Sequence, residues 1–153
     1  MNHKSMFTLL VIAGFMTLML FSCNKSDDSS SKEVRYPQLI GTWEGTTSQN
    51  QSIRIGIISV DTNLYVSTYK YKVLKFKADT LYQTMVYDME SPTMVSYLEN
   101  TTFIFRPYGG YSYYDYLKGT FDVTAMKLTG RFNTSFGESS DSVVGSFTAL
   151  KVK

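Results

Sequence analysis

Apolar and polar residues alternate with a period of two through most of the chain after residue 33, and this alternation constrains the fold more than any other feature. Ile53, Ile55 and Ile57, for example, alternate with Arg54 and Gly56. The same pattern recurs in segments 65–72, 74–78, 103–106, 119–123, 128–132 and 143–149. Successive side chains of a β-strand point to opposite faces, so this period is typical of strands with one buried face. No stretch after residue 33 shows helical spacing over three turns, and the sequence therefore predicts an all-β domain.

Turn-forming residues separate these runs and divide the domain into short strands. The strands are predicted at 39–47, 51–60, 64–72, 73–79, 81–88, 93–98, 101–106, 116–124, 126–133 and 143–151. Their mostly tight connections predict an antiparallel meander. Because closure removes exposed sheet edges, we expect an up-and-down barrel of about eight to ten strands, with a sandwich as the alternative.

The N-terminal segment has the composition of a targeting signal. A polar start containing Lys4 is followed by an uncharged apolar run at 7–21, which is 15 residues long. A membrane-spanning helix needs about 20 apolar residues, so the run fits the hydrophobic part of a signal peptide better. We therefore expect residues 1–22 to be a removable signal, which leaves enough chain for one domain.

The end of this signal resembles the lipobox of bacterial lipoproteins, because the small Ser22 directly precedes Cys23. That resemblance implies that Cys23 receives a diacylglycerol and anchors the mature protein without a spanning helix. The alternative is an ordinary signal peptide with a cysteine near its end. Residues 23–35 then form a lipidated cysteine and a polar, serine-rich tether.

Within the tether, a short charged segment is similar to the acidic export signal of surface-exposed lipoproteins of Bacteroidota. The residues that carry this resemblance are Lys25, Asp27 and Asp28. It implies a location in the bacterial outer membrane, with the domain at the cell surface. The alternative is an ordinary solvated linker.

The predicted domain lacks the histidine and cysteine that several classes of catalytic and metal site require. The one histidine is His3 and the one cysteine is Cys23, so a Ser-His-Asp triad, a Cys-His dyad, a thiolate or histidine metal site and an internal disulfide are excluded. The ten carboxylates after residue 33 mostly fall in turns and at strand ends, and none belongs to a calcium-loop motif. The net charge of +2 provides no strong field for nucleic acid. We expect a non-enzymatic protein without a metal or cofactor.

The first predicted strand contains Gly41 and Trp43, and this Gly-x-Trp resembles the first strand of lipocalins and of lipocalin-like bacterial lipoproteins. The resemblance covers most of the domain at 36–153. It implies that Trp43 closes one end of a barrel and that a basic side chain from a late strand, for which Arg131 is the candidate, packs over its indole. The chain differs from true lipocalins because no helix precedes its C-terminus and no disulfide is possible.

The predicted inward positions are almost wholly apolar or aromatic, with tyrosine hydroxyls as the main polar groups. Such a lining suits a small hydrophobic ligand bound in the barrel near one mouth. The residues expected to bind it are Ile55, Tyr69, Phe76, Phe103, Phe105 and Phe121.

A tyrosine-rich segment at 106–116 supports a different function. It holds five of the twelve tyrosines of the chain, namely Tyr108, Tyr111, Tyr113, Tyr114 and Tyr116. Tyrosine combines an apolar face with one polar group and suits sugar rings or a protein partner. The alternative prediction is therefore a surface accessory or inhibitor lipoprotein that binds a glycan or a protein. The same tyrosines could instead pack across strands and shield an edge.

Overall fold

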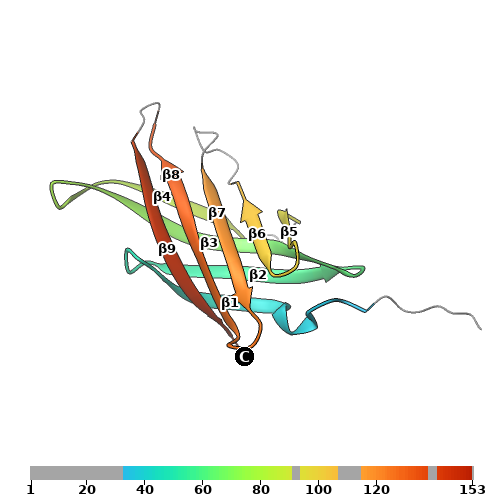
Figure 1. The fold of residues 1–153 in the computed structure, drawn as a ribbon. Coiled ribbons are helices and arrows are strands. Elements are labelled where there is room, and N and C mark those ends of the chain that lie inside the picture. Colours follow the sequence, from blue (N-terminus) through green and yellow to red (C-terminus); the bar gives the residue numbers. More distant parts are fainter. Residues whose placement is uncertain (1–32, 91–93, 107–114, 138–140, 153) are drawn as a thin grey trace, which may run out of the picture. The chain divides into compact units, whose positions relative to one another are not determined.

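The computed structural model describes residues 33–90, 94–106, 115–137 and 141–152. In these residues, nine strands form one antiparallel sheet that is strongly curled into a half-barrel (Figure 1). The strands are β1 (Gly41–Thr47), β2 (Ser52–Val60), β3 (Asn63–Lys77), β4 (Thr80–Met89), β5 (Ser96–Tyr97), β6 (Thr102–Phe105), β7 (Tyr116–Asp122), β8 (Lys127–Ser135) and β9 (Ser142–Lys151), preceded by the 3₁₀ turn η1 (Pro37–Leu39). The all-β antiparallel prediction is confirmed.

The strand order brings the two ends of the domain together in the middle of the sheet. The order is β4-β3-β2-β1-β9-β8-β7-β6, so the first and last strands are neighbours. In Figure 1, β7, β8 and β9 cross steeply in front of β1, β2 and β3. The short β5 pairs with β3, and the Ser96 hydroxyl of β5 donates a hydrogen bond to the Ile104 carbonyl of β6 at 3.0 Å. The inner faces of the two halves of the sheet therefore face each other.

The tight turns between strands are defined by left-handed backbone conformations and by side-chain hydrogen bonds. Ala78 and Asp79 connect β3 to β4 with φ values of 50° and 62°, the left-handed pair that a two-residue hairpin turn of type I′ requires. Asp61 also adopts a positive φ, which its short polar side chain tolerates. After β7, the Asp122 carboxylate accepts hydrogen bonds from the backbone N–H groups of Thr124 and Ala125 at 3.0 and 2.9 Å.

The predicted strands 64–72 and 73–79 are in fact one continuous strand, β3, which corrects the predicted break between them. Pairing with β4 continues through that point, from Tyr69 opposite Met89 to Lys77 opposite Thr80. An unbroken ladder leaves no place for a turn.

A bulge in β3 changes which residues face the interior. Gly56 pairs with Thr68 and Ile57 pairs with Val66, which leaves Ser67 as an extra residue. Side chains at even positions, such as Val66, are buried before the bulge, whereas the odd positions from Ser67 to Val73 are buried after it. Because β3 continues without a break, Phe76 has the opposite parity to Tyr69 and Tyr71 and is 52% exposed, so its predicted inward position is wrong.

The core consists largely of aromatic rings that reach across the curled sheet. Trp43 is fully buried; its indole N–H donates to the Leu39 carbonyl at 2.9 Å and its ring packs edge-on against Phe121 at 4.8 Å. Tyr69 of β3 packs against Phe105 of β6, with ring centroids 4.5 Å apart. These contacts join β1 to β7 and β3 to β6, so the interior is filled where the two halves of the sheet approach.

Among the described residues, no helix has the length and apolar character needed to cross a membrane.

Candidate functional site

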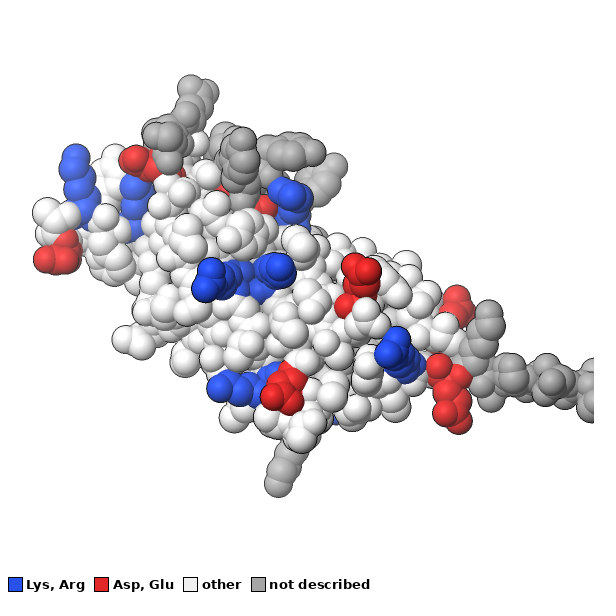
Figure 2. All heavy atoms as spheres, in the orientation of Figure 1, with Lys and Arg blue, Asp and Glu red and all other residues white. Residues whose placement is uncertain are grey.

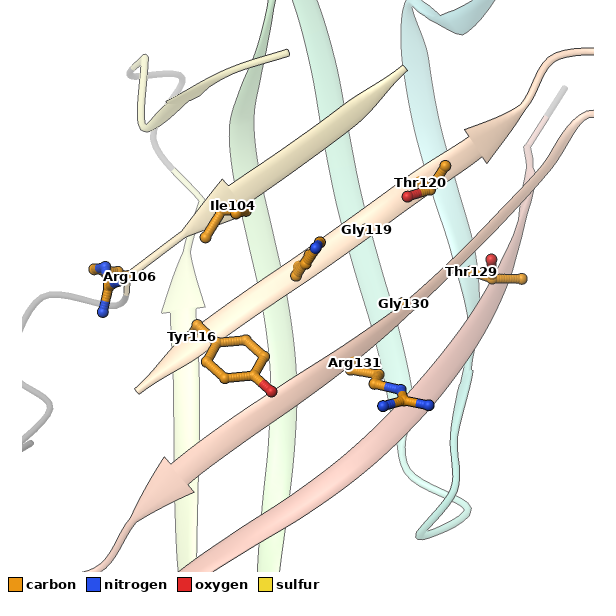
Figure 3. A pocket seen from close by; sticks show the side chains of 9 residues that line it. Ile104, Arg106, Tyr116, Gly119, Thr120, Thr129, Gly130 and Arg131 are labelled. Carbon is orange, nitrogen blue, oxygen red and sulfur yellow. The ribbon is translucent and has the colours of Figure 1, made fainter. Parts of the chain in front are cut away.

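The outer face of β6, β7 and β8 carries a groove of about 670 Å³ (Figure 3). Because side chains alternate along each strand, one set of residues builds the core and the intervening set lines this outer groove. The lining residues are Ile104, Arg106, Tyr116, Lys118, Gly119, Thr120, Thr129, Gly130 and Arg131. We call this feature the outer groove.

The cross-strand register places two cations side by side in the outer groove. Lys118 of β7 lies directly opposite Arg131 of β8, and both are exposed. Opposite residues on one face of an antiparallel pair have Cβ atoms about 5 Å apart, and like charges there are destabilising. No Asp or Glu of the described residues forms an ion pair with either side chain. Lys118 and Arg131 therefore place positive charge in the outer groove, and no described carboxylate pairs with either side chain.

Ion pairs elsewhere in the described residues show the contrast. Arg54 lies 3.4 Å from Glu44. The Lys70 ammonium lies 2.9 Å from both Asp88 and Glu90, and the hydrogen bonds that it donates to Glu90 and Asp88 raise the pKa of Lys70 to about 12. In Figure 2, Lys and Arg side chains lie together near the centre of the view, where β7 and β8 run in Figure 1, and no acidic side chain touches that group.

Hydroxyl and apolar groups lie beside this charge. Thr120 and Thr129 are opposite each other on the exposed face, and the hydroxyls of Thr120 and Thr102 are 3.1 Å apart. Ile104 is 55% exposed next to Lys118 in the register. In Figure 3, Tyr116 points toward Arg131 from the neighbouring strand. The outer groove thus offers cations, hydroxyl groups and one aromatic ring to the same ligand.

The position of Arg131 shows that its predicted contact with Trp43 is wrong. It was expected to pack over the Trp43 indole, but it is exposed on the outer face of β8, whereas Trp43 is fully buried inside. The alternation along β8 explains this, because the neighbouring Phe132 occupies the inward position. Gly41, the other residue of the predicted signature, begins β1 with a φ of 129°, a conformation that favours glycine.

Five of the six residues predicted to bind a ligand inside the barrel are buried in the core, and Phe76 is not. The buried five pack against other core side chains; Tyr69 and Phe105, for instance, contact each other. The buried residues are Ile55, Tyr69, Phe103, Phe105 and Phe121. A hydrophobic ligand among them stays a prediction.

Most residues of the other predicted sites lie outside the described residues. These are the lipid-attachment residue Cys23, the export-signal residues Lys25, Asp27 and Asp28, and the tyrosines Tyr108, Tyr111, Tyr113 and Tyr114. Tyr116, the last tyrosine of the segment, lines the outer groove.

Lys118 is a site residue that the sequence did not predict. Lys118 has an outward position in the alternating run at 117–121, and Arg131 has an outward position in its own run. These two outward positions are the sequence signal for the site. Their proximity depends on the β7–β8 register, which the alternation does not specify.

Within the described ranges, no group of three or more His, Cys, Asp or Glu side chains could hold a metal ion.

The chain matches no protein-family model, no curated protein and no solved structure.

Proposed function

We propose that the protein is a non-enzymatic binding module of the bacterial cell envelope, and that its outer groove binds a carboxylate-bearing saccharide. The observation that carries this proposal is the unneutralised pair of Lys118 and Arg131 on neighbouring strands. An anion that lies against both side chains removes their mutual repulsion, which costs up to about 1 kcal/mol at an exposed site.

The class of ligand follows from the mixture of groups in the outer groove. The planar guanidinium of Arg131 matches a carboxylate with two parallel hydrogen bonds, and the Lys118 ammonium adds a second positive charge. The Thr120 and Thr129 hydroxyls are suited to sugar hydroxyls. Tyr116 offers an aromatic face for the apolar side of a sugar ring. An acidic saccharide uses all of these groups, whereas a simple inorganic anion uses only the charge.

The outer groove is favoured over the interior for a specific reason. Trp43 and Phe121 contact each other at 4.8 Å, and Tyr69 and Phe105 at 4.5 Å, where a hydrophobic ligand in the barrel would need space.

The sheet as a whole is, in this proposal, a lipocalin-like barrel. Support comes from β5, which pairs with β3 and donates a hydrogen bond to β6.

The proposed location is the outer membrane, with the domain exposed at the cell surface. In this proposal lipidated Cys23 anchors the protein, the polar segment that follows it links the anchor to the domain, and Lys25, Asp27 and Asp28 direct export. In this arrangement the outer groove has access to extracellular saccharides.

The test is calorimetric titration of the full chain in detergent with trigalacturonate and, separately, with neutral galactotriose. We expect binding of the acidic trisaccharide only, weakened by high salt because the site is exposed to solvent.

Lys118→Gln and Arg131→Gln should each weaken binding about tenfold or more, since a hydrogen bond to a charged group contributes about 1.5–3 kcal/mol. Lys127→Gln removes the same charge from an exposed position on β8 outside the outer groove and serves as the control. Equal binding of the two saccharides, or unchanged binding by both groove variants, would exclude the proposed ligand class.

A further inference from the structure

A buried carboxylate lies on the mostly apolar inner face of the sheet. Asp115 directly precedes β7 and is 2% exposed. Its Oδ1 accepts a hydrogen bond from the Ser135 backbone N–H at 2.8 Å, whereas its Oδ2 is buried and has no hydrogen-bond partner among the described residues. No Lys or Arg of those residues forms an ion pair with it. A buried carboxylate in this state has lost its hydration without a compensating charge.

A buried threonine of the neighbouring strand lies beside Asp115 on the inner face. The register that places Tyr116 opposite Asn133 brings the next residues, Asp115 and Thr134, side by side on the inside. Thr134 is fully buried. These two residues contribute a carboxylate and a hydroxyl oxygen from adjacent strands.

Two tyrosines approach the same place from the other half of the sheet. Tyr71 of β3 and Tyr87 of β4 are paired in the register, and their rings stack at 4.8 Å. The Tyr87 hydroxyl donates to the Met85 sulfur at 2.8 Å, whereas the buried Tyr71 hydroxyl has no hydrogen-bond partner among the described residues. Burial raises the pKa of both tyrosines, and the charge of Asp115 contributes to the rise in each case. The phenols therefore remain protonated and available as neutral oxygen groups.

This cluster holds one buried carboxylate with no described cation beside it, and its Asp115 Oδ2 and Tyr71 Oη atoms are buried without a hydrogen-bond partner. We propose that it is a monovalent cation site, in which Asp115 Oδ2, Tyr71 Oη and Thr134 Oγ1 bind Na⁺ or K⁺ between the β3–β4 and β7–β8 pairs. Oxygen ligands without nitrogen or sulfur suit a hard cation. A single carboxylate balances a charge of +1, whereas calcium sites in proteins usually combine several charged oxygen ligands. The bound ion would neutralise Asp115 and join the two halves of the sheet. This site is independent of the outer groove.

The test measures the thermal unfolding midpoint of the full chain in detergent in NaCl, in KCl and in N-methylglucamine chloride at the same ionic strength. The organic cation is too large for a site inside the sheet. We expect at least one of the two inorganic salts to raise the midpoint by about 3–5 °C relative to the organic salt, because an ion that binds only the folded state stabilises it.

Two variants assign this effect to the cluster. Asp115→Asn keeps the shape of the side chain and removes its charge, and Tyr71→Phe removes one oxygen ligand. Asp115→Asn should abolish the salt-specific rise and Tyr71→Phe should reduce it by half or more. Asp61→Asn, an exposed turn residue whose positive φ suits asparagine, is the matched control and should retain the full rise.

Each outcome decides the proposal. Equal midpoints of the wild-type chain in the three salts would overturn the proposal. A rise that persists in Asp115→Asn would place the ion elsewhere. If Asp115→Asn does not fold, Tyr71→Phe decides alone: a salt-specific rise reduced by half or more supports the site, and an unchanged rise overturns it.

Discussion

Phe132 of β8 lies directly opposite Gly145 of β9, and its ring occupies the space that a Cβ at position 145 would need. The same relationship joins Phe103 to Gly119 and Phe147 to Gly130 in neighbouring strands. Each ring thus covers the backbone of a glycine on the adjacent strand. The absence of a side chain lets these rings lie against the sheet, so the curled inner face is packed without pushing β8 and β9 apart.

Gly145→Ala should therefore destabilise the protein by about 1–3 kcal/mol, the range for forcing an extra carbon into a packed core. The measurement is the free energy of unfolding from urea titration. In a Phe132→Leu background the added methyl group has more room, so the cost of Gly145→Ala should fall clearly. Strictly additive effects of the two substitutions would show that Phe132 is not what makes glycine necessary.

Trp43→Ala should cost about 3–5 kcal/mol of unfolding free energy, because it empties a large and fully buried aromatic site beside Phe121. Trp43→Phe keeps an aromatic ring but loses the hydrogen bond to the Leu39 carbonyl, and it should cost less. Urea titration of both variants is the measurement. A loss below about 1 kcal/mol for the alanine variant would be inconsistent with the central position of Trp43.

The all-β class and much of the core could be predicted from the sequence because burial follows the alternation directly. Ile53, Ile55 and Ile57 are buried as expected, since β2 keeps its alternation through these three positions. In β3 the alternation is ambiguous: Tyr65 and Tyr69 have the same parity, but the extra residue Ser67 separates them. A bulge depends on pairing with the neighbouring strand, and the residues of one strand do not reveal it.

The outer groove could be predicted only in part, for a related reason. The outward positions of Lys118 and Arg131 follow from the alternation in their own strands. Their direct opposition depends on the β7–β8 turn, in which Asp122 accepts hydrogen bonds from two backbone N–H groups. A shift of the register by one residue would place Arg131 on the other face relative to Lys118.

The raised pKa values of two buried tyrosines lead us to expect a lower free energy of unfolding in alkaline solution. Burial raises the pKa of Tyr71 above its usual value of 10.0 and raises that of Tyr87 to about 12. Below pH 10 both phenols are neutral in the folded and unfolded chains, so their contribution to stability is fully present. Above pH 10 the unfolded chain ionises first, and the free energy of unfolding should fall by about 1.4 kcal/mol per pH unit for each tyrosine that stays neutral in the folded state.

Urea titrations between pH 9 and pH 12 measure this slope. Tyr71→Phe should remove the share of the slope that comes from Tyr71. Tyr82→Phe, at a position that is 65% exposed, is the control and should leave the slope close to that of the wild-type chain. An unchanged slope in Tyr71→Phe would mean that Tyr71 does not control the alkaline transition.

Anchoring through Cys23 gives the last prediction, which concerns the N-terminal segment. If Cys23 carries the lipid, cells grown with an alkyne-labelled fatty acid should incorporate the label into the wild-type protein and not into Cys23→Ala. The loss of two acyl chains removes most of the membrane affinity, at about 0.8 kcal/mol for each buried methylene, so the variant should also leave the membrane fraction after a high-salt wash. Asn24→Ala changes the neighbouring residue without removing the thiol, and it should be labelled and sedimented like the wild-type protein. Equal labelling of Cys23→Ala and the wild-type chain would exclude Cys23 as the attachment point. A Cys23→Ala protein that is unlabelled but remains in washed membranes would show that another segment holds the protein there.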